Sequence, residues 1–436
     1  HARNGPRGKR VVYRCPGGPT PRGPGSNAGR VHRPFARRHV PDEPRRRYSC
    51  VRGDCPRNRP VGPTGGDILP AVTTSHRPVG ITARDLLQRR VAALPVLPAP
   101  PTGADGFARW QASTRDALAR VLGVSEELRA HPEPVGWTIT STTPCDGFTR
   151  HHVRYDGALG GTGTAYVLVP DPVPTVTVAG IACLHGHGNM LGKELVSGGG
   201  HEGGADSDEV ATVVAQYGYD FAARLARRGY VVIAPDALGF GERVDDRGAP
   251  HHQAMGRVVE YLGYTHTGLR LLDDQRALSV LASWPGVDAS RLGAVGLSEG
   301  GKRTLFLAAF DNRVRTAVVS GYFTTIREEV AVWDRLGGWD LCNALPGLLH
   351  VADLPDIASL IAPRPLLIQN GREDRLYTLA AVKTGFSNVA GAYSGIGSED
   401  AVALDLFDGG HRFVHEGPEA WVARWLPPEA GSEVGD

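Results

Sequence analysis

The chain of 436 residues has no long apolar run. No stretch approaches the roughly 18 consecutive apolar residues that a membrane-spanning helix needs. No apolar core of a secretory signal lies near the start either. A segmental repeat of 20–50 residues, the mark of solenoids and propellers, is also absent. These absences predict a soluble protein without a membrane partner.

Cysteine is scarce. The six cysteines form no C-x-x-C pair, so a disulfide framework is not expected and a reducing cytoplasm is the predicted location. A zinc site built on Cys50 and Cys55 would lack convincing histidine partners. We therefore do not favour that site.

Negative charge is almost missing from the first 60 residues, which hold 16 Arg or Lys against 3 Asp or Glu, and 10 of the 33 prolines. The segment shows neither helical nor alternating periodicity and cannot bury enough apolar surface to fold. We predict that residues 1–79 are disordered, and the start at His1 leaves open whether they belong to the native protein. A basic arm can bind nucleic acid, but with few aromatic residues for stacking, that partner is not favoured.

Order is predicted from residue 80 to residue 430, as one catalytic domain. Residues 80–170 hold two helices followed by the first strands, and beyond them apolar strands alternate with amphipathic helices. The strands are predicted at 136–144, 149–156, 163–170, 176–186, 230–239, 291–296, 315–322, 364–371 and 403–410, and the main helices at 81–94, 106–123, 208–229, 269–284, from 299 and at 418–426. This alternation predicts a mostly parallel, doubly wound sheet flanked by helices. The loops 185–207 and 239–267 and the segment 322–362 are expected to cover a site.

The stretch "LGAVGLSEGGKRTLFLAAF" (292–310) places one serine between an apolar strand and a helix. Gly296-Leu297-Ser298-Glu299-Gly300 matches the nucleophile elbow G-x-S-x-G in its strand–turn–helix context. Small neighbours let the backbone turn sharply and expose the serine. Ser298 is therefore the candidate nucleophile.

A serine nucleophile needs a base, and the base needs an acid. His411 follows the last predicted strand, and Asp374 follows the strand before it. The chain order Ser, Asp, His is that of α/β-hydrolases. Glu373 is the alternative acid, whereas Asp408 is interpreted as structural because its strand position directs the side chain elsewhere. His251 and His252 are expected to face solvent in a lid loop.

Acyl transfer also needs donors for the oxyanion. The backbone N–H of Glu299 is one candidate, and the N–H of His187 in the loop "HGHGNM" is the other, with Gly188 as second choice. The spacing of His185 and His187 could also suit a metal, but no third ligand accompanies them at ligand-like spacing. We expect no metal and no cofactor.

Several stretches carry a family resemblance, among them "LHGHGNMLGKE", "GYVVIAPDALGFGER", "WPGVDASRLGAVGLSEGGKRTLFLAAFDNRVRTAVVSGY", "ADLPDIASLIAPRPLLIQNGRED" and "DLFDGGHRF". Residues 80–430 resemble the serine-type α/β-hydrolases of the dienelactone hydrolase and acetyl xylan esterase group. Dienelactone hydrolases proper use a cysteine where this chain has Ser298. The resemblance therefore implies an esterase or deacetylase.

The predicted function is a serine hydrolase that cleaves a small-molecule carboxylic ester through an acyl-enzyme, with a short acyl group such as acetyl. One alternative is a peptidase or amidase of the same fold, although peptidase relatives usually carry a propeller domain for which this chain has no room. The other alternative is nucleic-acid binding through the basic arm. The oligomeric state is left open.

Overall fold

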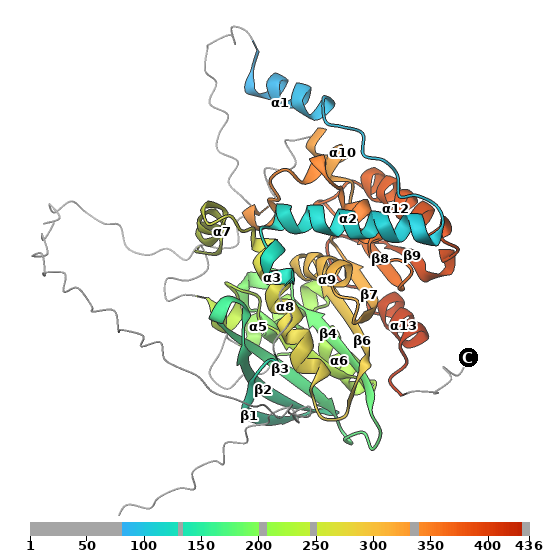
Figure 1. The fold of residues 1–436 in the computed structure, drawn as a ribbon. Coiled ribbons are helices and arrows are strands. Elements are labelled where there is room, and N and C mark those ends of the chain that lie inside the picture. The colour runs from blue at the N-terminus through green and yellow to red at the C-terminus, as the bar shows by residue number, and fades with distance from the viewer. Residues whose placement is uncertain (1–80, 130–133, 200–206, 245–250, 332–339, 430–436) are drawn as a thin grey trace, which may run out of the picture. The chain divides into compact units, whose positions relative to one another are not determined.

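The computed structural model describes residues 81–129, 134–199, 207–244, 251–331 and 340–429 (Figure 1). The expected disorder of residues 1–79 lies outside these ranges. Contacts divide the chain into a unit of residues 1–15 and 87–436 and a unit of residues 16–86. Of the second unit, residues 81–86 are described and contain the start of helix α1 (Ala83–Ala92). The sheet and the site belong to the first unit.

A nine-stranded sheet forms the centre of this unit, in the order β1-β2-β3-β5-β4-β6-β7-β8-β9. Its strands are β1 (Trp137–Cys145), β2 (Phe148–Asp156), β3 (Thr162–Pro170), β4 (Val178–Leu184), β5 (Val231–Pro235), β6 (Val287–Leu297), β7 (Val314–Ser320), β8 (Leu366–Gly371) and β9 (Val402–Phe407). β1, β2, β3 and β5 pair antiparallel in that order. β5, β4, β6, β7, β8 and β9 are parallel. The expected mostly parallel sheet is confirmed.

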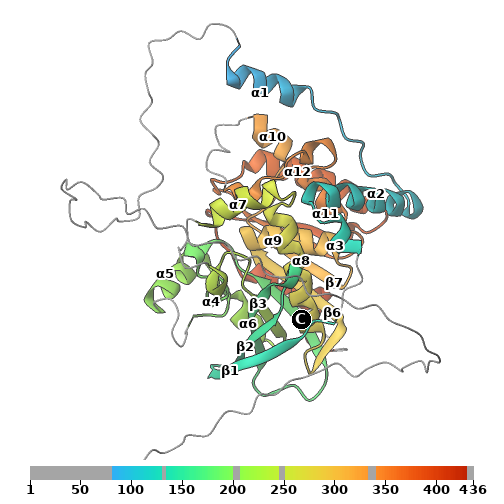
Figure 2. The ribbon, with the colours of Figure 1, turned by 60° about the vertical axis from the view of Figure 1, so that its left-hand side comes forward.

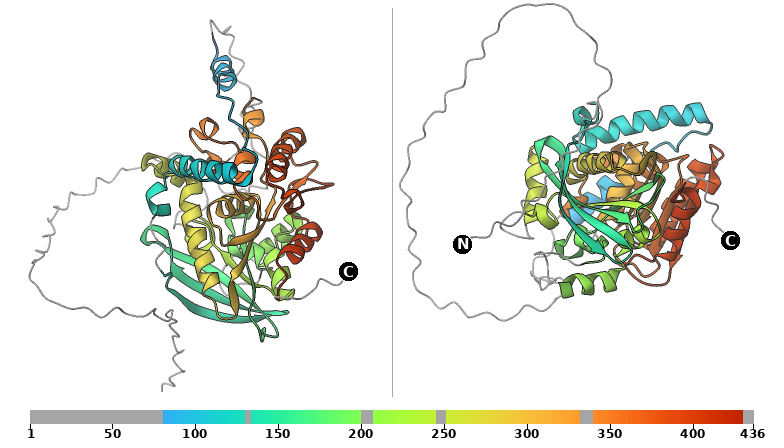
Figure 3. Two further views of the ribbon diagram at one scale, coloured as in Figure 1. Left: turned by 45° about the vertical axis from the view of Figure 1, so that its right-hand side comes forward. Right: turned by 90° about the horizontal axis from the view of Figure 1, so that it is seen from below.

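Helices cover both faces of the sheet. Besides α1, the described helices are α2 (Ala104–Leu122), α3 (Ser125–Arg129), α4 (Lys193–Val196), α5 (Ser207–Tyr217), α6 (Phe221–Arg227), α7 (His251–Tyr261), α8 (His266–Ala282), α9 (Glu299–Phe310), α10 (Ile326–Ala331), α11 (Leu354–Ser359), α12 (Leu379–Ser394) and α13 (Glu416–Trp425). The view from below in Figure 3 shows α2, in cyan, on one side of the sheet and the green helices on the other. Among the described residues, every helix is too short or too polar to cross a bilayer.

Strand β4 shows why both faces must be covered. Ala182 and Leu184 pack in one apolar cluster with residues of α8 and α9. Ile181 and Cys183, which alternate with them along the strand, pack in a second cluster with residues of α5, α6 and α13. All four side chains are buried, as in a parallel strand sandwiched between helix layers. Figure 2 shows α8 and α9 over this central part of the sheet.

Two sequence expectations are corrected. Residues 208–229 form two helices, α5 and α6, because the backbone at Gly218 has a φ of +69° that ends the first. The region 239–267 is not only loop, since α7 begins at His251. Helix α7 packs against the side chain of Leu341 at Gly256. His251 and His252 therefore lie in a helix, and their side chains are outside what the structure describes.

The strand order places the site. From β4 the chain crosses to β5 on one side and then to β6 on the other side of β4. At such a switch point the loops after the two central strands open at the same edge of the sheet, where open α/β sheets bind their ligands. Here these are the loop after β4, with His187, and the turn after β6, with Ser298.

Candidate active site

Ser298 lies on a strained turn between β6 and α9. Its backbone has φ 61° and ψ −122°, which is rare for a residue with a side chain. Its N–H donates to the carbonyl oxygen of Ser320 in the neighbouring β7, with an N···O distance of 2.9 Å. Such strain clusters at functional sites, where the surrounding structure maintains it.

The glycines around Ser298 are required by close backbone packing. A Cβ on Gly296 would come within 2.2 Å of the Gly300 carbonyl oxygen, and one on Gly300 within 1.8 Å of the Leu184 carbonyl oxygen. Both separations are far inside van der Waals contact. Helix α9 can therefore start directly against β4 only with glycine at these positions, which is the tight turn expected from the sequence.

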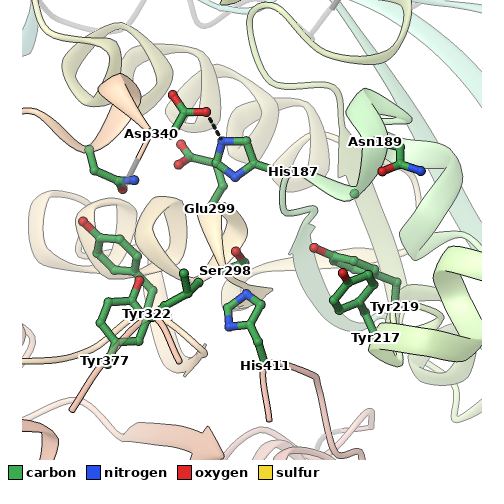
Figure 4. A pocket seen from close by; sticks show the side chains of 13 residues that line it. His187, Asn189, Tyr217, Tyr219, Ser298, Glu299, Tyr322, Asp340, Tyr377 and His411 are labelled. Atoms are coloured by element: carbon green, nitrogen blue, oxygen red, sulfur yellow. Dashed lines mark ion pairs between the residues drawn. The ribbon is translucent and has the colours of Figure 1, made fainter. Parts of the chain in front are cut away.

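His411 and Asp374 are brought together from the loops after β9 and β8. His411 Nδ1 lies 2.7 Å from Asp374 Oδ2. The other carboxylate oxygen of Asp374 accepts a hydrogen bond of 2.9 Å from the N–H of Leu376. The Asp374 side chain is 1% exposed and that of His411 is 20% exposed. Figure 4 shows the His411 ring beside the Ser298 hydroxyl.

The other two carboxylates considered as the acid face solvent. Glu373 is exposed, and its backbone N–H bonds to Gly409. The Asp408 side chain is 94% exposed and lies 3.1 Å from Arg372. Asp374 is thus the carboxylate of the three that contacts His411.

His185, the first residue after β4, is a structural residue. Its ring is buried, with Nδ1 2.8 Å from the Gly186 carbonyl oxygen, and Nε2 accepts the N–H of Ala237 at 3.0 Å. Burial, together with the positive charge of Arg303, lowers the pKa of His185 to about 3. A neutral ring with both nitrogens bonded to backbone cannot join His187 as a metal pair.

The loop after β4 lies directly against the elbow. A Cβ on Gly186 would come within 2.8 Å of the Leu297 carbonyl oxygen and 3.0 Å of Ser298 Cβ. His187 and Glu299 therefore both border the cavity that holds Ser298. The N–H of Glu299 belongs to the first turn of α9, where N–H groups have no partner within the helix. The assignment of these two N–H groups as oxyanion donors stays a prediction.

A cavity of about 420 Å³ holds Ser298 and His411. Tyrosines supply much of its wall: Tyr322 and Tyr377 on one side of Ser298 and Tyr217 and Tyr219 on the other (Figure 4). No sequence pattern marked these four tyrosines as site residues. Tyr322 follows β7 at the same sheet edge as Ser298, and that position is a signal that could have identified it.

A buried charge cluster lies under the elbow. The Glu299 carboxylate is 2.6 Å from Arg270 Nη1 in α8 and 2.7 Å from Lys302 Nζ, and all three side chains are at most 1% exposed. Burial alone would raise the pKa of Glu299, but attraction to Lys302 and Arg270 holds it well below its ordinary value. Lys302 also donates to the Cys342 carbonyl oxygen at 2.6 Å. Sequence reasoning considered only the backbone of Glu299 and missed this cluster.

The structure supplies partners for His187 that the sequence did not suggest. His187 Nε2 lies 3.3 Å from Asp340 Oδ2 and 3.5 Å from Cys342 Sγ. Asp340 and Cys342 come from the 3₁₀ turn at residues Leu341–Asn343 and its flank, about 150 residues further along the chain. The sequence predicted no metal because no third ligand stands at ligand-like spacing from His185 and His187, and that pattern could not reveal partners so distant along the chain.

Known proteins resemble this chain in sequence or in fold. The protein "Putative hydrolase YtaP" of Bacillus subtilis (strain 168) is 29% identical over 213 residues, which cover 47% of this chain and 68% of that protein. A "putative acetyl xylan esterase" from Bacteroides fragilis NCTC 9343 has a similar structure, with a TM-score of 0.61, 17% identity and coverage of 81% of this chain and 91% of that one. A glucuronoyl esterase from Solibacter usitatus has a TM-score of 0.56 and 16% identity, with coverage of 76% and 97%.

The TM-scores show that the two solved structures share the fold of this chain, and at 16–17% identity they show the fold alone. The family is shown by sequence, because the model of the Abhydrolase family matches residues 95–393. The matched range contains the elbow at Ser298 and the loop of Asp374, and it ends before His411. This match over most of the chain, on a mostly parallel sheet with a serine at its switch point, shows that the protein belongs to the Abhydrolase family.

Proposed function

We propose that this protein is a serine hydrolase that cleaves carboxylic esters through an acyl-enzyme intermediate. The observation that carries the proposal is that Ser298, on its strained turn, shares one cavity with His411, whose ring is hydrogen-bonded to the buried Asp374. Acyl transfer needs a serine nucleophile, a base that takes its proton and a buried acid that orients the base.

The roles follow from the hydrogen bonds. Asp374 accepts the Nδ1–H of His411, which leaves Nε2 without a proton and able to take one from Ser298. The serine oxygen then attacks the ester carbonyl, and the backbone N–H groups of Glu299 and His187 stabilise the developing oxyanion. The protonated His411 next donates its proton to the departing alcohol. Water, deprotonated by the same histidine, then attacks the acyl-enzyme, and His411 returns that proton to the Ser298 oxygen as the acid leaves.

We assign a short acyl group such as acetyl to the catalytic cavity. A second cavity, of about 490 Å³, shares Tyr322, Asp340 and Asn343 with it. This second cavity is lined largely by leucines, among them Leu345 and Leu348. A long acyl chain would have to pass the polar residues at the junction to reach that apolar wall. The solved structures with a similar fold include a putative acetyl xylan esterase and a glucuronoyl esterase, which makes acetylated sugars a reasonable substrate class to test.

The experiment is a panel of p-nitrophenyl esters from acetyl to decanoyl, acetylated sugars and a matched p-nitroanilide. We expect the highest kcat/KM for the acetyl ester, little anilide cleavage and no turnover with Ser298→Ala. A clear preference for decanoyl would contradict the short-acyl assignment. Faster cleavage of the anilide would favour the amidase alternative. The cytoplasmic location remains a prediction from cysteine usage.

A further inference from the structure

Three side chains with metal-binding atoms meet at the rim of the catalytic cavity. His187 Nε2, Asp340 Oδ2 and Cys342 Sγ all lie within 4.8 Å of one another. They come from two segments, the loop after β4 and the turn at 340–343. Figure 4 shows the His187 ring and the Asp340 carboxylate facing each other across this point. Imidazole nitrogen, thiolate sulfur and carboxylate oxygen are the ligands that zinc takes in proteins.

The distances fit a tetrahedral ion better than a plain ion pair. With Zn–S of about 2.3 Å and Zn–N and Zn–O of about 2.0–2.2 Å, tetrahedral edges are about 3.6 Å for S···N and about 3.4 Å for N···O. The corresponding distances here are 3.5 Å and 3.3 Å. A charged N–H···O hydrogen bond is shorter, about 2.7–2.9 Å. The same ring nitrogen of His187 faces both partners, and the three ligand atoms lie within 4.8 Å of one another, close enough for one ion to bridge them.

The ligands are held in place without an ion. Asp340 Oδ1 accepts the N–H of Cys342 at 3.1 Å, which fixes the carboxylate relative to the thiol. Lys302 holds the turn through its 2.6 Å bond to the Cys342 carbonyl oxygen. The Cys342 thiol lies 3.3 Å from Glu299 Oε2, to which it donates. A prepositioned ligand set lowers the conformational cost of binding.

We propose that His187, Asp340 and Cys342 form a Zn²⁺ site with its fourth coordination position open to the catalytic cavity. His187 and Asp340 line that cavity, so water or a ligand oxygen there can reach the ion. Three protein ligands and one open position is the arrangement of reactive rather than purely structural zinc sites. On binding, the thiol proton of Cys342 leaves to solvent as the Sγ–Zn bond forms, and the hydrogen bond from that thiol to Glu299 is lost. Glu299 keeps its ion pairs with Arg270 and Lys302. The thiolate and the carboxylate together neutralise the two charges of the ion.

The test measures zinc binding directly and does not depend on esterase activity. Full-length protein is stripped with EDTA, and Zn²⁺ is titrated in competition with a chromogenic chelator. We expect one equivalent to bind to the wild type. Loss of a residue that only supports a metal ligand weakens metal affinity about 10–100-fold, or by about 1.4–2.7 kcal/mol. Each of the variants Cys342→Ser, Asp340→Asn and His187→Gln removes a ligand itself, so each should weaken zinc binding by more than this. Co²⁺ in place of Zn²⁺ should give a thiolate-to-metal charge-transfer band in the wild type that Cys342→Ser lacks.

Matched controls separate this site from other cysteines. Cys145→Ser changes a half-buried thiol in β1. The triple variant Cys15→Ser, Cys50→Ser, Cys55→Ser removes the three thiols of the basic segment, residues 1–60. Both should bind zinc like the wild type, and so should Ser298→Ala, which separates this proposal from the catalytic one. Thermal melts establish that each variant is folded. If Cys342→Ser does not fold, Asp340→Asn, whose side chain is partly exposed, still provides the test.

Two results would overturn the site. One is binding by the wild type that is no tighter than binding by folded Asp340→Asn and His187→Gln. The other is zinc binding that disappears only in the triple variant of the basic segment. A wild-type Co²⁺ spectrum without thiolate charge transfer would exclude Cys342 as a ligand and likewise refute the proposal.

Discussion

The exchange of Asp374 for asparagine tests the hydrogen-bond logic of the site. Asp374 has two bonded oxygens: Oδ1 accepts from the Leu376 N–H at 2.9 Å and Oδ2 contacts His411 Nδ1 at 2.7 Å. In Asp374→Asn the amide oxygen must stay on the Leu376 N–H, because the amide NH₂ cannot accept that bond. The NH₂ then faces Nδ1 of His411.

A donor facing Nδ1 forces the histidine proton onto Nε2. His411 in that tautomer cannot accept the proton of Ser298, although the geometry is otherwise unchanged. The same substitution in the serine-protease triad lowers kcat about 10⁴-fold, which corresponds to about 5 kcal/mol of transition-state stabilisation. We expect a loss of this order here, with KM changed little.

The assay is the kcat for p-nitrophenyl acetate, with a thermal melt to show that the variant is folded. Glu373→Gln is the matched control, since it removes a neighbouring carboxylate that is exposed, and it should keep kcat within about twofold, as exposed positions usually do. A greater loss in Glu373→Gln than in Asp374→Asn would reverse the two roles. An Asp374→Asn enzyme with more than about a tenth of wild-type kcat would refute the tautomer argument.

Three further outcomes follow from packing and charge. Glu299→Gln leaves two buried cations underpaired, so urea unfolding should show a loss of about 3–5 kcal/mol. Because burial lowers the pKa of His185 to about 3, only the unfolded chain takes up its proton as pH falls below about 6.5. Stability should therefore drop by about 2 kcal/mol between pH 8 and pH 5, and an equal drop in His185→Gln would contradict this assignment. Gly300→Ala would put a Cβ 1.8 Å from the Leu184 carbonyl oxygen and should cost more than about 4 kcal/mol. By contrast, Gly391→Ala, in open space on α12, should be neutral or stabilising by about 0.5–1 kcal/mol.

The sequence predicts the sheet and the elbow because both leave local signals. Buried parallel strands read as short apolar runs, and the turn at Ser298 needs glycines at fixed positions. Asp374 and His411 could be identified because the fold puts its acid and base after the last strands, in a set order. The prediction therefore used turn chemistry and chain order, and both are visible in one sequence.

The buried charge cluster under the elbow and the group around His187 depend on contacts between distant segments of the chain. Nothing near Arg270 indicates that its partner is Glu299, 29 residues further on. Likewise, His187 and Cys342 are 155 residues apart and meet only because the turn at 340–343 packs over the loop after β4. The end of α5 was missed because the glycine at 218 was read as an interior helix residue. Such features follow from three-dimensional packing and have no periodic pattern.

The central claim is that Ser298 forms the covalent intermediate, and labelling with a fluorophosphonate probe tests it most directly. The probe reacts with a serine only where a base has activated the hydroxyl. We expect one label per wild-type chain, located on Ser298 by peptide mass spectrometry, and none on folded Ser298→Ala. Equal labelling of wild type and Ser298→Ala, or a label on another serine, would contradict it.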